Sequence, residues 1–404
     1  MTFKNSLRRQ LLQELESCGF KLNGEEFCPH PTEKQTIRDL HRAQRQEKLA
    51  ETMKSLGQRF WDFVNFFAEG SEIIPEEIEP TLIPVEPNSD TSALFRFASL
   101  LWSVPVSAGY GRRLRFLVWD KRTDRLMGLM ALGDPVFNLR ARDTWIGWTL
   151  KQKMANLCHV MDAYVLGAVP PYSYLLCGKL IASAVASTEI SDAFRQKYGN
   201  SIGIISKKRK APRLTLITTT SALGRSSLYN RLRLGDDELY IRVGETAGWG
   251  HFHFSKPTFE RMRAYLRMAH HDYANGYRFG NGPNWRFRAV RATLKFLDMP
   301  QAFLQHGIQR EVFVIPLKTK TQAILRGESV KSISLTRPLS EITHNCVRRW
   351  IAPRAFRDKR YNLVTRDMIR RWIRGRSTPA EDIPAYVAPT RKIEKFVHLT
   401  GVPA

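Results

Sequence analysis

Apolar residues near the N-terminus recur at the spacing of an α-helix. Leu7, Leu11, Leu15 and Cys18 follow one another at intervals of four, four and three residues, and Gly19 ends the run. Further on, acids and bases alternate along the outward positions, as on a solvated helix face, before a dense apolar run at residues 60–67. We therefore expect residues 1–70 to form an N-terminal helical region.

The pattern changes to alternating strands and helices after residue 91. The segment LRFLVWDKRTDRLMGLMALGD predicts two strands joined by a polar turn at residues 120–124. The segment GKLIASAVASTEISDAFRQKYGN predicts a helix that ends at Tyr198 and Gly199, and LTLITTT predicts another strand. Residues 91–255 are therefore predicted to be a mixed α/β core domain with one central sheet and helices against it.

Glycines and aromatic residues alternate at the end of this predicted core. Residues 239–243 and 251–254 have the apolar pattern of short strands, and Gly244, Gly248 and Gly250 lie between them. Glycine is entropically costly in such a ribbon unless the backbone turns sharply or approaches another group closely. We expect a hairpin that folds closely against the sheet around Trp249.

Composition marks the remaining boundaries of the chain. Residues 71–90 contain four prolines and six acids, which predicts a linker between the helical region and the core. Residues 256–376 form a basic, mainly helical extension with a short strand at EVFVIPL, and residues 377–404 form a tail with four prolines.

Charge is the strongest bulk property of this sequence. The 404 residues include 63 Lys and Arg against 38 Asp and Glu, a formal net charge of +25. Counting along the chain gives −4 for residues 1–100, +11 for residues 101–254 and +18 for residues 255–404. A positive charge concentrated in the C-terminal half predicts contact with a polyanion such as DNA or RNA, with DNA as the first expectation.

The basic extension supplies the candidate phosphate-binding residues. Within residues 366–374, a helical arc places Met368, Ile369, Trp372 and Ile373 on one side and arginines on the other. Arginines interleaved with tryptophan and phenylalanine offer phosphate contacts and flat surfaces for bases. The predicted nucleic-acid-binding residues are Arg286, Arg288, Arg291, Arg348, Arg349, Arg366, Arg370, Arg371 and Arg374.

Several other classes of protein and site are disfavoured. The sequence has no apolar run long enough for a membrane span and no secretory signal, so we expect a cytoplasmic protein without a membrane partner. Five widely spaced cysteines without a CxxC pair argue against a disulfide framework. GxxxxGK[ST] does not occur in the sequence, which argues against ATP hydrolysis.

Two further groups of residues are candidates for chemistry. His251 and His253 would face one side of a strand, but no carboxylate cluster accompanies them at a recognisable spacing, and we predict no metal site. Arg142 and Asp143 form a candidate functional pair. An arginine beside aromatic residues more often stacks on them, and an aspartate at such a place more often fastens a turn, so we favour a structural role.

Four long motifs then give the chain a family resemblance. RLRFLVWDKRTDRLMGLMALGD, LRARDTWIGWT, GETAGWGHFHF and LQHGIQREVFVIPL together resemble the DruA proteins, over about residues 90–327. DruA proteins are components of the Druantia anti-phage defence systems and share a domain with some transposase-associated proteins. The resemblance implies an antiviral role alongside other subunits of the same system, and it assigns no active-site residue.

A second similarity concerns the fold alone. The order of elements is similar to that of the GNAT-type acyltransferases, which implies a central mixed sheet of GNAT-like appearance. The segment matching their pyrophosphate loop, LLCGKLIASA, has only Gly178, so we predict no bound cofactor. Tyr229 is the candidate general acid if the comparison holds, and a core tyrosine otherwise.

The sequence thus leaves three functions open. The first is a nucleic-acid-binding subunit of an antiviral system, and the alternative is a GNAT-like transferase that modifies nucleic acid or protein. The third is a structural adaptor. Whether the chain catalyses a reaction stays undecided at this point.

Overall fold

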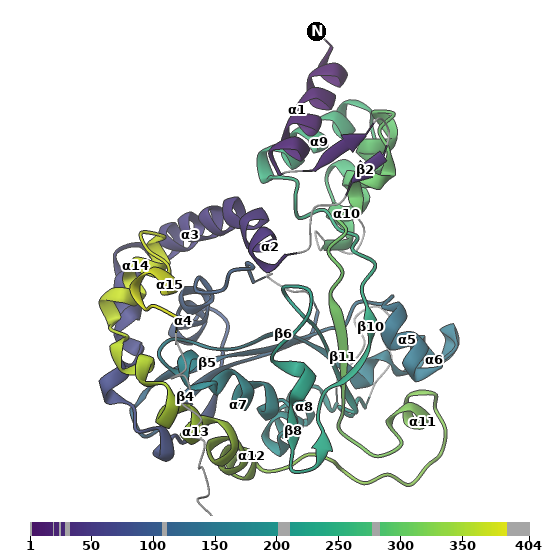
Figure 1. Cartoon of the computed structure of the whole chain (residues 1–404). Helices are drawn as coiled ribbons and strands as arrows, with labels where there is room; N and C mark the ends of the chain where they lie inside the picture. Colours follow the sequence, from purple (N-terminus) through teal and green to yellow (C-terminus); the bar gives the residue numbers. More distant parts are fainter. Residues whose placement is uncertain are drawn as a thin grey trace, which may run out of the picture.

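The computed structural model describes residues 2–18, 20–23, 26–28, 33–106, 111–200, 211–276 and 283–385. A seven-stranded sheet lies at the centre, with helices on both faces and a small helical lobe above it (Figure 1). This architecture confirms the predicted α/β class with a central mixed sheet. None of the helices in the described part of the chain has both the length and the apolar character that a membrane crossing requires.

The central sheet has the strand order β10-β11-β7-β6-β5-β4-β3. Its strands are β3 (Pro80–Pro84), β4 (Arg113–Asp120), β5 (Arg125–Gly133), β6 (Val160–Ala168), β7 (Leu216–Thr220), β10 (Ile241–Glu245) and β11 (Glu311–Pro316). Neighbouring strands run antiparallel except β6 and β7, which are parallel and pair only from Val160 to Asp162 on β6. The predicted hairpin is confirmed as β4 and β5, and the buried Asp120 at its turn accepts a hydrogen bond from the Tyr172 hydroxyl at 2.7 Å.

One face of the sheet is covered by α7 (Cys177–Ala184), α8 (Thr188–Tyr198) and α12 (Leu339–Cys346), whose apolar side chains share one buried cluster with the strands. The single helix predicted for residues 178–200 is therefore two helices. The chain breaks between them because Ser187 caps α8, accepting a hydrogen bond from the Ile190 N–H at 3.3 Å.

The opposite face is covered in two parts. The helices η1 (Gly57–Phe66), α4 (Asp90–Ser99) and α14 (Arg366–Arg374) pack over β4 and β5. Over β10 and β11 lie α5 (Arg140–Ile146) and α11 (Thr321–Leu325), with α6 (Leu150–Asn156) beside them.

The other helices and strands are short or peripheral. Further α-helices are α2 (Lys34–Leu40), α3 (Arg42–Leu56), α13 (Ala352–Arg357) and α15 (Pro379–Asp382), and a π-helix, η9 (Val347–Ile351), joins α12 to α13. The short 3₁₀ segments are η2 (Gly70–Glu72), η3 (Pro75–Glu77), η4 (Leu157–His159), η5 (Tyr172–Leu175), η6 (Tyr229–Arg231), η7 (Asp272–Ala274), η8 (Gln301–Leu304) and η10 (Lys359–Leu363). Two strands form a hairpin outside the central sheet, β8 (Arg233–Leu234) and β9 (Asp237–Glu238).

A lobe of three helices projects above the sheet (Figure 1). It consists of α1 (Phe3–Ser17), α9 (Lys256–Met268) and α10 (Pro283–Phe296), with the hairpin β1 (Lys21–Asn23) and β2 (Glu26–Cys28) beside them. Leu7, Leu11 and Leu15 of α1 are fully buried in one cluster with apolar residues of α9 and α10. The first predicted helix thus packs with segments that we assigned to the C-terminal extension.

Two extended runs connect this lobe to the sheet. Residues 244–250 lie beside residues 304–310 as an irregular antiparallel pair that continues β10 and β11. Three backbone hydrogen bonds join the two runs, from Thr246 N–H to Arg310 O, from Gly307 N–H to Gly248 O and from Gly250 N–H to Leu304 O.

The hairpin predicted around Trp249 is wrong. Residues 251–254 form no strand, and β10 (Ile241–Glu245) pairs with β11, which lies much later in the chain. Trp249 is 49% exposed and only bridges Gln305. The glycines serve close approach instead. A Cβ atom at Gly248 would lie 3.0 Å from the backbone carbon of Gly307.

The sheet also extends beyond residues 91–255 on both sides. β3 lies within the predicted linker, and β11 lies within the predicted extension, where it confirms the strand expected at EVFVIPL. In the predicted tail, Asp382 of α15 accepts a hydrogen bond from the Trp372 indole at 2.7 Å, while residues 386–404 lie outside the described residues.

Gly248→Ala should lower the free energy of unfolding by about 2 kcal/mol or more. Gly248 has φ of +70°, where an alanine is strained, and the added Cβ atom would press on the Gly307 backbone. Urea denaturation measures the change. Gly178→Ala is the matched control, because a Cβ atom there meets nothing within 4 Å and a helical alanine adds up to about 1 kcal/mol. Equal effects of the two substitutions would contradict the close-approach explanation.

Candidate nucleic-acid interface

The nine arginines predicted to bind nucleic acid occupy three separate parts of the molecule. Arg286, Arg288 and Arg291 are on α10, Arg348 and Arg349 are on η9, and the other four are on α14. In Figure 1, α10 belongs to the upper lobe, η9 lies between α12 and α13 below the sheet, and α14 lies at the side of the sheet. The structure therefore does not bring the nine residues together on one surface.

The arginines of α14 are engaged with neighbouring groups. Arg366 pairs with Glu72 at 2.7 Å and donates a hydrogen bond to the Phe67 carbonyl at 2.8 Å. The other three contacts are Arg370 with Asp367 at 2.7 Å, Arg371 with Asp382 at 3.3 Å, and Arg374 over the Trp61 ring at 4.3 Å. The predicted arc is confirmed, with Ile369, Trp372 and Ile373 buried. On its cationic side, Arg366 and Arg374 fasten α14 to the body, whereas Arg370 pairs within the helix.

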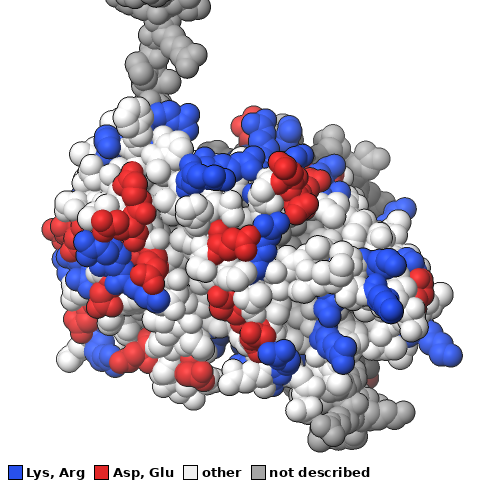
Figure 2. Space-filling view, turned by 90° about the horizontal axis from the view of Figure 1, so that it is seen from below, with Lys and Arg blue, Asp and Glu red and all other residues white. Residues whose placement is uncertain are grey.

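The arginines of η9 differ from each other. Arg349 donates a hydrogen bond to the Gly235 carbonyl at 3.2 Å and lies over the Trp350 ring at 5.4 Å. Arg348 is exposed. On the face seen from below, the Lys and Arg residues that the structure describes lie interspersed with Asp and Glu (Figure 2).

On α10 the first arginine points inward. Arg286 donates a hydrogen bond to the Phe254 carbonyl at 3.0 Å, and its guanidinium lies 4.6 Å from the centre of the Phe259 ring. Burial lowers the pKa of Arg286. These contacts bind α10 to the start of α9, so Arg286 has a structural role.

The outward face of α10 carries a row of cations. Arg288, Arg291 and Lys295 are all exposed, and their spacing of three and four residues places them on one side of the helix. Residues 283–296 contain no Asp or Glu. Lys295 was missing from the predicted set, although its spacing from Arg291 is the signal that would have found it. This face is the candidate nucleic-acid interface.

The sequence is similar to the proteins of one known family. The family described as Druantia protein DruA matches residues 31–327. The chain belongs to the DruA family. The Druantia protein DruA of Escherichia coli (strain UMEA 4076-1) is 44% identical over 359 residues, which cover 88% of this chain and 89% of that protein. No solved structure matches the chain.

Membership of the DruA family confirms the predicted resemblance and places the chain in the Druantia anti-phage defence system. A system component implies further subunits. The matched residues 31–327 include α10 and the whole sheet, whereas η9 and α14 lie beyond them.

Tyr229 lies among aromatic side chains in this DruA-family protein. Its ring stacks on Tyr240 at 4.8 Å between centroids and meets Phe313 edge-on at 5.3 Å. Burial raises the pKa of Tyr229 to about 12. These contacts account for Tyr229 as a packing residue, and its role as a general acid stays a prediction.

Arg142 and Asp143 hold two loops together, as the structural interpretation predicted. Arg142 is fully buried and donates hydrogen bonds to Asp143 at 2.7 Å and to the carbonyls of Val136 and Phe137 at 2.8 and 2.9 Å. The Trp148 indole donates to the same Asp143 oxygen at 3.1 Å, and the Arg142 guanidinium lies 5.6 Å from the centre of a Trp148 ring.

The two candidate histidines lie where the lobe meets the sheet. His253 Nε2 donates a hydrogen bond to the Phe303 carbonyl at 2.8 Å, and His306 lies edge-on to Phe252. Within the described ranges, no group of three or more His, Cys, Asp or Glu side chains could hold a metal ion. Burial lowers the pKa of His251, His253 and His306 to about 4 in each case.

From the lowered pKa values of these histidines, we predict that acidic pH destabilises the junction between the lobe and the sheet. Because their folded pKa values lie below the ordinary value near 6.5, their contribution to stability is complete above pH 6.5 and is lost as pH falls toward 4. We expect the free energy of unfolding to fall by about 1–3 kcal/mol per histidine over this interval. Urea titrations at successive pH values measure it.

His251→Gln should make that pH dependence shallower, because a glutamine in its place takes up no proton. His344→Gln is the control, since His344 is exposed on α12 and distant from the lobe (Figure 1). An unchanged pH profile for His251→Gln would refute the explanation.

Proposed function

We propose that this protein is a nucleic-acid-binding subunit of the Druantia system, which acts with partner proteins and contacts backbone phosphates through the outward face of α10. The observation that carries the proposal is the row formed by Arg288, Arg291 and Lys295, without a carboxylate on that helix. Arg291 and Lys295 make no ion pair with any described residue, so their charge is available to a polyanion.

The dimensions of α10 suit a nucleic-acid backbone. Seven residues separate Arg288 from Lys295, which is about 10 Å along a helix. A DNA duplex presents about six phosphate charges over that length of axis. The lobe that contains α10 also projects from the body formed by the sheet and its covering helices (Figure 1).

The alternative, a GNAT-like transferase, has one supporting observation, the parallel pair β6–β7 within an otherwise antiparallel sheet. Two contacts count against it. The Tyr240 hydroxyl donates to the Ala182 carbonyl of α7 at 2.7 Å, and Lys179, at the start of α7, lies 4.7 Å from the centre of the Trp350 ring. Lys179, the cation nearest to the expected pyrophosphate position, is therefore engaged with an aromatic ring, and the carbonyl of Ala182 is bound to Tyr240. Calorimetric titration with acetyl-CoA tests this alternative, and tight binding would favour it.

Arg288→Ala combined with Arg291→Ala should weaken binding to a short DNA duplex by about tenfold or more. It should also lower the slope of log K against log salt concentration by about 0.9 for each phosphate contact removed. Fluorescence anisotropy at several salt concentrations measures both quantities.

The matched control for this pair is Arg348→Ala combined with Arg370→Ala, which removes the same charge from η9 and α14. We expect the control to change affinity and slope little. Equal losses from the two pairs would show that only net charge matters, and a flat salt profile for the unmodified protein would remove the proposal. Retention of partner proteins without DNA would favour the structural adaptor.

A further inference from the structure

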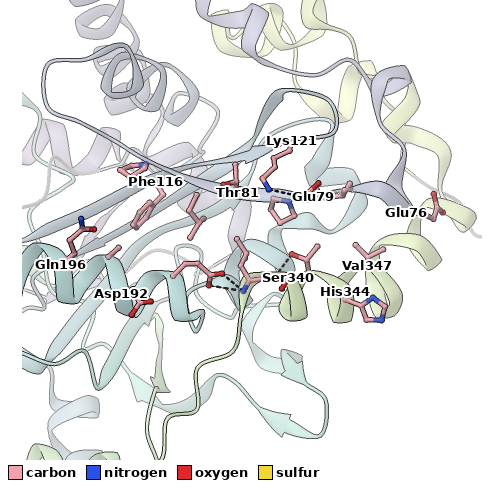
Figure 3. A pocket seen from close by; sticks show the side chains of 18 residues that line it. Glu76, Glu79, Thr81, Phe116, Lys121, Asp192, Gln196, Ser340, His344 and Val347 are labelled. Carbon is pink, nitrogen blue, oxygen red and sulfur yellow. Dashed lines mark hydrogen bonds and ion pairs between the residues drawn. The ribbon is translucent and has the colours of Figure 1, made fainter.

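A groove of about 660 Å³ lies along the open edge of the sheet, between β3 and the helices α8 and α12 (Figure 3). Apolar side chains form part of its lining, among them Ile78, Leu82, Phe116, Ala193 and Val347. The groove therefore offers apolar contact to any group that enters it.

The charged lining of this groove is acidic. Four carboxylates line it, against a single lysine, Lys121, and they are Glu76, Glu79, Glu189 and Asp192. The chain as a whole carries a formal net charge of +25, so the sign of the charge is locally reversed here. Such a lining repels nucleic acid and attracts cations.

The carboxylates differ in how far they are engaged. Glu189 accepts a hydrogen bond from the Leu339 N–H at 3.0 Å and so fastens the start of α12 to α8.

The other three carboxylates are less engaged. Glu79 pairs with Lys121 at 2.6 Å, with both side chains more than half exposed. Asp192 pairs with the exposed Arg195 at 2.9 Å. Glu76 forms no ion pair with any residue in the described ranges. Exposed pairs of this kind are weak and exchange readily with a competing cation.

The open edge of β3 adds backbone hydrogen-bond acceptors to the groove, with fewer backbone donors. Hydrogen bonds from Lys121 N–H to Glu79 O and from Val85 N–H to Arg115 O show that odd-numbered residues pair with β4. The backbone groups of Pro80, Leu82 and Pro84 therefore point to the open side. Because proline has no N–H, this edge presents three carbonyl oxygens and only the Leu82 donor.

Carboxylates, carbonyl oxygens and apolar side chains together indicate which kind of ligand the groove suits. An added β-strand needs donors and acceptors in alternation, and the prolines remove two of the donors. A guanidinium or ammonium group supplies donors only, which suits carbonyls and carboxylates. The aliphatic stem of arginine or lysine covers apolar surface while its charged end reaches the rim.

We propose that the groove between β3, α8 and α12 docks an extended segment of a partner protein that carries arginine or lysine beside apolar residues. The segment lays its apolar side chains on Leu82 and Phe116 and places its cations against Glu76, Glu79 and Asp192. This site is separate from α10, so a partner and a nucleic acid bind the chain without competing for residues.

A peptide of alternating arginine and leucine, acetylated and fluorescently labelled, tests the proposal with the full chain. Its counterpart, with glutamate in place of arginine, is the reference. Because the protein is strongly cationic, general electrostatics favour the acidic peptide, so preferential binding of the arginine peptide requires a local acidic site. We expect that preference, and binding of the arginine peptide no tighter than that of its counterpart would overturn the proposal.

Two double variants locate the binding. Glu76→Lys with Asp192→Lys reverses two charges on the carboxylate rim of the groove. This double variant should weaken binding of the arginine peptide at least about tenfold. Glu16→Lys with Glu238→Lys makes the same change in net charge at exposed positions on α1 and β9, and should have little effect. Equal loss in both variants would overturn the site. Duplex DNA binding should survive the rim variant, which separates failure of this proposal from failure of the α10 interface.

Discussion

β11 lies between β7 and β10 in the central sheet, and this placement determines where the lobe stands. β11 is hydrogen-bonded on both sides, and Val312 to Ile315 are fully buried. Because β10 and β11 are neighbours in the sheet but far apart in the sequence, the chain between them must leave the sheet and return. The lobe containing α9 and α10 is that excursion, and the paired runs 244–250 and 304–310 fix where it stands.

Charged residues have different roles in different parts of this basic protein. On α14, arginines meet carboxylates brought from residues 72 and 382, so they bind segments of the chain to one another. On α10 no such partner is supplied by the helix itself, and the cations remain at the surface. Along the β3 edge the sign is reversed. The formal net charge of +25 therefore does not predict the charge of any one of these surfaces. The residues packed around each cation determine whether it is already paired or can bind a ligand.

Regular local patterns were sufficient to predict many elements. The α1 spacing, the β4–β5 hairpin, the strand at EVFVIPL and the buried side of α14 all follow from short-range periodicity, since one face of each is buried. β3 was missed because prolines and neighbouring acids give its segment the composition of a linker. Its edge position is what tolerates those prolines, and only the assembled sheet reveals that position.

Residue types and short-range neighbours along the chain were enough to predict the family resemblance, the α/β class, the surplus of positive charge and the amphipathic helices. The tertiary structure was needed to establish which arginines are paired, since Arg366 and Glu72 lie 294 residues apart. It likewise decided that the glycines near Trp249 face residues 304–310 rather than a hairpin partner. Pairing between distant segments depends on the order of strands in the sheet, and local pattern does not encode that order.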